Sequence, residues 1–144
     1  GFLRLVLPST PDVVKQSDVL WWMSILALAS IVYGALVCLR QKDWKRLVAY
    51  SSVSHMGFCM LGIFALNPSG IAGSMLQQVN HGISTGLLFL LVGLMYERKK
   101  TQEIAAYGGL VKPMPAFALV FLAASVSSMG LPPLNGFIGE FRIL

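Results

Sequence analysis

The sequence predicts an all-α membrane protein, a polytopic bundle of transmembrane helices of which one is discontinuous. Hydrophobic residues make up 56% of the 144-residue chain and charged residues only 12%, whereas charged residues make up about 25% of an ordinary soluble domain. Residues 47–96 contain no Asp, Glu, Lys or Arg. The apolar segments are long enough to cross a bilayer and lack the alternation of barrel strands. They must therefore be helices, because lipid offers backbone groups no hydrogen-bond partner.

The N-terminal part of the chain predicts a short helical tail, a connection and a first span. Residues 1–7 are typical of the end of an earlier helix that stops at Pro8. The polar residues 9–18 predict a connection, and Asp18 is expected to cap the helix that follows it. That helix is predicted over residues 19–39, which are almost entirely apolar.

Two basic loops define the expected orientation of the chain. The second and third spans are predicted over residues 47–66 and 71–96, and the uncharged turn 67–70 joins them. Eight of the eleven Lys and Arg residues lie in the loops 40–46 and 97–112, which are two spans apart and so face one side. The positive-inside rule places both loops in the cytoplasm or its equivalent. This orientation explains the net charge of +5 better than binding to nucleic acid or anionic lipid would.

The fourth span, residues 114–144, is predicted to be broken near the middle of the membrane. Consecutive prolines remove two backbone donors and clash with the preceding turn, and flanking glycines loosen the helix further. Unwound backbone at this depth is tolerated only against protein or a water-filled cavity, an arrangement found at transporter binding sites. The residues expected to form this break are Gly130, Pro132, Pro133 and Gly136.

Two histidines, His55 and His81, lie near the centres of the second and third spans, and the chain has no others. An imidazole accepts a proton on one nitrogen and donates one from the other, and its ordinary pKa of about 6.5 makes both charge states accessible near neutrality. We therefore predict that both are stations of a proton path. In the alternative interpretation, both are neutral and stabilise helix packing through hydrogen bonds of about 0.6 kcal/mol each. Two ionisable groups at similar depth in a membrane favour the functional interpretation.

Further polar side chains share the helical faces of these histidines. Residues three or four positions apart lie on one side of a helix. A lipid-facing helix would not carry such a face. Both faces are therefore expected to point inward, toward each other or toward helices outside this sequence, and to hold water between the histidines. The supporting residues predicted in this way are Ser51 and Ser54 beside His55, and Gln77, Ser84 and Thr85 beside His81.

One acidic residue, Glu140, follows the predicted break by about one helical turn. A carboxyl group that carries a proton is neutral, and a low-dielectric site prefers that state. We predict that Glu140 lies at the mouth of the path and is reached through water held by the free carbonyls of the break. Two alternatives stay open: Glu140 lies near the outer surface, or it pairs with Arg142.

No motif in the sequence predicts a metal or cofactor site. The chain has no GxGxxG dinucleotide fingerprint. Cys38 and Cys59 lie in apolar segments without another Cys or His at a metal-ligand spacing. We expect both thiols to be buried, reduced packing residues.

Three stretches of the chain resemble one known family. They are KRLVAYSSVSHMGF (residues 45–58), NHGISTGLLFLLVGLMYER (residues 80–98) and LPPLNGFIGEF (residues 131–141). Together they are similar to the antiporter-like subunit M, or chain 4, family of respiratory complex I. The resemblance implies an antiporter-like fold of fourteen membrane helices in two inverted repeats, of which these residues form helices nine to twelve. We expect residues 1–144 to be a single, partial membrane domain, and the sequence to be a fragment.

The resemblance also implies roles for particular residues. His55 and His81 correspond to the histidines of the family's tenth and eleventh helices. Glu140 corresponds to the acid of its discontinuous twelfth helix, which is thought to connect a central polar axis to the outer side. By this resemblance, the family's other key groups, a glutamate and two lysines, are expected before Gly1. The sequence departs from the family's pattern at Lys42, Trp44 and the paired Pro132–Pro133.

By this resemblance, the chain is expected to be a proton-translocating membrane subunit of an NADH:quinone oxidoreductase, a translocase subunit without a redox site of its own. No cofactor is then expected in this chain, and flavin, iron–sulfur clusters and quinone belong to partner subunits. The expected partners are other membrane subunits of complex I, including neighbouring antiporter-like subunits, and lipid, with no nucleic acid. The expected location is the bacterial inner (plasma) membrane, with the mitochondrial inner membrane as the alternative.

Two other functions stay open from the sequence. A cation/proton antiporter, or the membrane subunit of a membrane-bound hydrogenase, would use the same helix bundle, and the local residues hardly separate these functions from the first one. A purely structural bundle would instead keep its inward polar faces dry.

Overall fold

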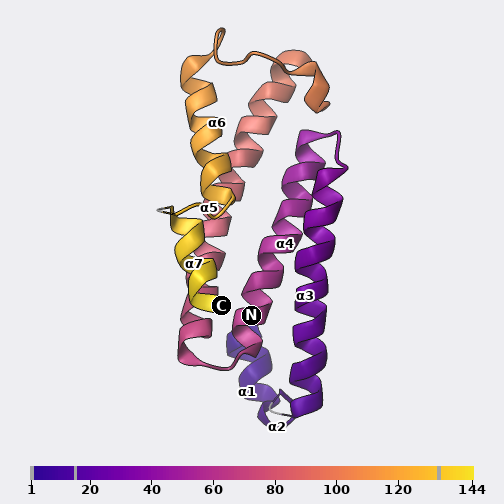
Figure 1. Ribbon diagram of the computed structural model, residues 1–144, viewed down its shortest axis with the longest axis vertical. Helices are drawn as coiled ribbons and strands as arrows, with labels where there is room; N and C mark the ends of the chain where they lie inside the picture. The colour runs from indigo at the N-terminus through magenta and orange to yellow at the C-terminus, as the bar shows by residue number, and fades with distance from the viewer. Residues whose placement is uncertain (1, 15, 133) are drawn as a thin grey trace.

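The chain folds into a bundle of long, roughly antiparallel helices (Figure 1). The computed structural model describes residues 2–14, 16–132 and 134–144. Named strands are absent from these described residues, which agrees with the predicted all-α class. The main helices are α3 (Ser17–Leu39), α4 (Trp44–Phe64), α5 (Pro68–Lys99), α6 (Pro115–Ser128) and α7 (Asn135–Ile143).

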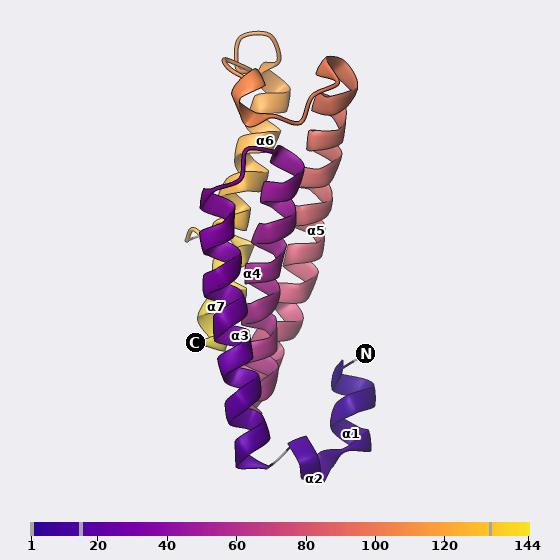
Figure 2. The same ribbon diagram turned by 90° about the vertical axis from the view of Figure 1, so that its right-hand side faces the viewer.

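Helix α5 is the central element of the bundle. It packs against α4 on one side and against α6 and α7 on another, and α3 covers the far side of α4 (Figures 1 and 2). Helices α3, α4 and α5 are each long and apolar enough to cross a membrane. A buried apolar cluster joins α4, α5 and α6 and consists of Val48, Leu88, Leu91, Val92 and Ala124.

Many large apolar side chains remain exposed on the outer faces of these helices. On α3, Trp21 and Leu26 are 61% and 60% exposed. On α5, Leu90 is 70% exposed. A soluble monomer rarely exposes so continuous an apolar surface. Lipid or further protein therefore covers these faces.

The N-terminal segment differs from two of the expectations. It forms η1 (Phe2–Val6), α1 (Leu7–Ser9) and α2 (Pro11–Val14). Helical structure does not stop at Pro8, because proline is tolerated in the first turn of a helix, where its missing N–H is not needed. Asp18 does not cap α3 either. The helix begins at Ser17, so Asp18 lies in the first turn, where its carboxylate interacts favourably with the positive end of the helix dipole.

The two basic loops lie at the same end of the bundle (Figure 1). The α3–α4 connection binds the segment after α5, which includes the short helix η2 (Ile104–Ala106). The Trp44 N–H donates to the carbonyl of Gln102 at 3.0 Å, and the Ile104 N–H donates to the carbonyl of Lys42 at 2.8 Å. The basic residues of both loops are therefore held on one surface, as the orientation argument requires.

Residues 129–134 separate α6 from α7. Gly130 has a φ of +67°, in the left-handed region that favours glycine. Pro133 lies outside the described residues. Helix α7 begins before Gly136, so this residue belongs to the first turn of α7 and not to the break. Beyond the break, α7 lies below α6 and packs along α5 (Figure 1).

The contact between α3 and α4 depends on a glycine. A Cβ atom on Gly57 would lie 2.7 Å from Ile31 Cγ1 and 2.9 Å from the carbonyl oxygen of Ala27. The backbone oxygen cannot move without shifting α3. A Cβ atom on Gly93 of α5, by contrast, would meet nothing within 4 Å.

We predict that Gly57→Ala destabilises the fold, because the added methyl group forces α3 and α4 apart. Overpacking of this kind costs about 1–3 kcal/mol. Gly93→Ala is the matched control, and it is neutral or stabilises by up to about 1 kcal/mol, since alanine favours a helix more than glycine does. The free energy of unfolding in mixed micelles with increasing dodecyl sulfate measures both. Equal stability of the two variants would contradict the prediction.

Candidate functional site

The structure brings together the three titratable residues that the sequence singled out. His55 comes from the middle of α4, His81 from the middle of α5 and Glu140 from α7. His55 Nδ1 lies 3.0 Å from Glu140 Oε1, and the ring centroids of the two histidines are 5.2 Å apart. The side chains of His55 and Glu140 are 17% and 19% exposed. His55 therefore contacts both other residues and lies at the centre of the cluster.

Glycine residues allow α7 to reach this position. A Cβ atom on Gly139 would overlap the side chain of Gln77, and one on Gly73 would lie 2.9 Å from Arg142 Cβ. Because neither glycine carries a side chain, α7 can lie directly against α5. The next residue along α7, Glu140, then faces His55 on the neighbouring helix.

Glu140 has a second partner in Gln77. The amide nitrogen of Gln77 donates to Glu140 Oε1 at 3.0 Å, and Gln77 is only 3% exposed. Among the described residues, the amide oxygen of Gln77 has no hydrogen-bond partner. Glu140 is therefore held by His55 and Gln77, and the structure gives no ion pair between its carboxylate and Arg142 among the residues it describes.

The other predicted polar residues divide into two groups. The Thr85 hydroxyl lies 3.2 Å from a ring nitrogen of His81, so it belongs to the cluster. Ser51 instead donates to the carbonyl of Val48 in its own helix at 2.8 Å. Ser54 donates at 3.0 Å to the carbonyl of Ile31 on α3. The two α4 serines thus satisfy backbone groups, whereas Gln77 and Thr85 of α5 contact titratable groups.

A small polar cavity lies beside the histidines and has a volume of about 10 Å³. A cavity of roughly this size with several polar groups can hold one water molecule. Three of its polar residues, Asn80, Ser127 and Ser128, were not selected from the sequence, although Ser84 was. The signal for the two serines was their position directly before the predicted break. The lining residues are His55, Gln77, Asn80, His81, Ser84, Ser127, Ser128 and Gly136.

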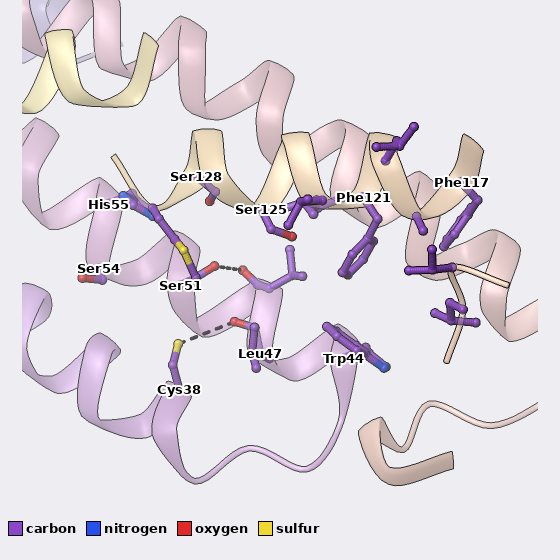
Figure 3. Close-up of a pocket in the computed structure, with 18 of the residues that line it drawn as sticks. Cys38, Trp44, Leu47, Ser51, Ser54, His55, Phe117, Phe121, Ser125 and Ser128 are labelled. Atoms are coloured by element: carbon purple, nitrogen blue, oxygen red, sulfur yellow. Dashed lines mark hydrogen bonds between the residues drawn. The ribbon is translucent and has the colours of Figure 1, made fainter. Parts of the chain in front are cut away.

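A much larger groove of about 1080 Å³ is also lined by His55 (Figure 3). One end is polar, where His55 and Ser128 lie close to each other, and both of these residues also line the small cavity. The other end is aromatic and contains Trp44, Phe117 and Phe121. His55 and Ser128 therefore stand between a mainly apolar space and a polar one.

This geometry permits proton exchange between His55 and Glu140. At 3.0 Å a proton lies between His55 Nδ1 and Glu140 Oε1, because two bare acceptors would repel each other. When Nε2 also carries a hydrogen, the pair can hold this proton on the nitrogen, as imidazolium and carboxylate, or on the oxygen, as imidazole and carboxylic acid. Its net charge is the same in both forms, so the transfer adds no net charge to the membrane interior.

Comparisons with known proteins agree with this fold. The chain matches the family described as "NADH:quinone oxidoreductase/Mrp antiporter, TM" over residues 1–144. It is similar over its whole length to the NADH-quinone oxidoreductase subunit M of Rhodobacter capsulatus (49% identical, covering 28% of that relative) and of Rickettsia bellii (46% identical, covering 29%). It is also 43% identical to NADH-ubiquinone oxidoreductase chain 4 of Marchantia polymorpha, of which it covers 29%.

The chain thus spans less than a third of the length of these curated relatives. The family match covers every residue of the chain, and it confirms both the predicted family and the predicted class of helical membrane protein. The chain belongs to the membrane-subunit family of NADH:quinone oxidoreductases and Mrp antiporters.

Proposed function

We propose that this chain is part of a proton-translocating membrane subunit of respiratory NADH:quinone oxidoreductase. The observation that carries the proposal is the position of His55, whose Nδ1 lies 3.0 Å from Glu140 Oε1 and whose ring centroid lies 5.2 Å from that of His81. Three titratable side chains from three helices form one continuous row. Groups of this kind are costly inside a membrane and are found there mainly along ion or proton pathways.

In the proposed mechanism, each proton moves along this row by passing from one titratable group to the next. His55 accepts a proton on one ring nitrogen and donates one from the other. On the Nδ1 side its partner is Glu140. On the other side, a water molecule in the small cavity bridges His55 and His81, with Ser84 and Ser128 as further hydrogen-bonding groups.

In this proposal, electron transfer takes place in other subunits. The chain has neither a dinucleotide fingerprint nor a cysteine cluster. We expect no cofactor in this chain, and we expect flavin, iron–sulfur clusters and quinone in partner subunits of the complex. The neighbouring antiporter-like subunits and lipid then cover the exposed apolar faces of α3 and α5.

The relatives come from bacteria and from the organelles of plants and algae. We propose the bacterial plasma membrane for this chain, with the mitochondrial inner membrane as the alternative. In either membrane, the surface formed by the two basic loops faces the cytoplasm or the matrix.

One alternative function is cation/proton exchange. The family description includes Mrp antiporters, and the row of His81, His55 and Glu140 could serve an exchanger equally well. Redox-driven translocation and ion exchange differ in what drives the proton, and this difference can be measured.

We predict that Glu140→Gln or His81→Ala in the full-length subunit lowers proton pumping. Loss of a group that accepts and donates the proton slows its transfer by about tenfold or more. The measurement is the number of protons pumped per electron in membrane vesicles, with NADH oxidation followed in parallel. Glu97→Gln is the matched control, because Glu97 is an exposed acid at the loop end of α5 and should leave pumping unchanged. An unchanged pumping ratio in both test variants would refute the proposed path.

A second prediction separates the two functions. Vesicles that contain the complex but receive no NADH should show no proton movement when a sodium gradient is applied, because redox chemistry drives translocation in the proposed function. Proton movement driven by the sodium gradient, and abolished by Glu140→Gln, would instead establish the antiporter.

A further inference from the structure

The two carboxylate oxygens of Glu140 have different surroundings. Oε1 lies 3.0 Å from His55 Nδ1 and 3.0 Å from the amide nitrogen of Gln77. Oε2 faces the helix break, since a Cβ atom built on Gly130 would lie 2.8 Å from Oε2 and 3.9 Å from Oε1. One oxygen therefore belongs to the histidine side of the cluster and the other to the break.

Gln77 is itself held in place by the packing of α7. Its side chain is buried under Gly139, where even a methyl group would overlap it. The neighbouring Gln78 shows the contrast, because it is exposed and its amide donates to the hydroxyl of Ser74 on the same helix. Only the first of these two consecutive glutamines can reach the carboxylate.

We propose that Gln77 is a positioning residue that distinguishes the two oxygens of Glu140. It keeps Oε1 toward His55 and leaves Oε2, on the side of the break, as the oxygen that bears the proton when Glu140 is neutral. A neutral carboxyl group has one carbonyl and one hydroxyl oxygen, and the carbonyl oxygen is the better acceptor. Because Oε1 accepts from the Gln77 amide and from His55 Nδ1–H, the neutral form is favoured with its carbonyl at Oε1 and its hydroxyl at Oε2.

This inference rests on the proposed function, in which Glu140 takes up a proton, and it adds a direction to that step. The hydroxyl group points into the break next to Gly130. A proton that Glu140 accepts from His55 therefore reaches the break after a half-turn of the carboxyl group about its Cγ–Cδ bond. The half-turn carries the protonated oxygen to the side of the break and brings the other oxygen to His55 and Gln77. The carboxyl group keeps its contact with His55 in both of its charge states.

The test is the infrared C=O stretch of protonated Glu140 in the purified complex. Acidification protonates Glu140 whether or not it carries protons during turnover, and loss of the band in Glu140→Gln identifies it. In Gln77→Met the carbonyl loses one donor at similar side-chain volume, so the band should move to higher wavenumber. Gln78→Met is the matched control and should leave the band in place.

The position of the C=O band in the unmodified protein gives a second test, which does not depend on a change at Gln77. A carbonyl oxygen that accepts two hydrogen bonds absorbs at the low end of the carboxyl range, whereas a free carbonyl at Oε2 would absorb at the high end. A band at the high end, or no shift in Gln77→Met, would overturn the inference. A shifted band together with normal pumping in both Glu140→Gln and His81→Ala would keep the oxygen assignment and refute the proposed function instead.

Discussion

The close approach of α7 to α5 is the contact on which the proposed site depends. Gly73 and Gly139 add no side chain of their own between the two helices. With even one methyl group at either position, α7 would have to shift, and the 3.0 Å contact between Glu140 and His55 would lengthen. Hydrogen bonds weaken steeply with distance, so glycine packing controls whether the acid and the imidazole can share a proton.

The helix break also affects the contact between α7 and α5. Helix α6 ends at Ser128 and α7 begins at Asn135, so α7 packs along α5 as a separate helix. Gly130 adopts a left-handed conformation at this point and also leaves room for Glu140 Oε2. Gly130 thus contributes to the course of the backbone at the break and also borders the Glu140 carboxylate.

The sequence predicted the components of the site better than their contacts. Apolar spans, basic loops and mid-span histidines follow from composition and spacing alone, because the bilayer restricts what can lie inside it. The sequence did not reveal that Glu140 bonds His55 directly, since that contact depends on how closely two helices pack. For the same reason, Ser54 could not be recognised as a partner of α3, nor Ser127 and Ser128 as part of the cavity.

Electrostatic repulsion explains why a row of three groups would carry protons one at a time. Two charged imidazoles 5.2 Å apart would repel each other by about 3 kcal/mol at an effective dielectric constant of about 20. In the proposed path, a proton arriving at one imidazole is therefore favoured only after the other has lost its own. Ionised Glu140 relieves this repulsion because it lies against His55. In the proposed path, neutralising Glu140 would disfavour a second positive charge in the row until a proton leaves through the break. The same spacing that allows transfer thus also limits how many charges the membrane interior must hold.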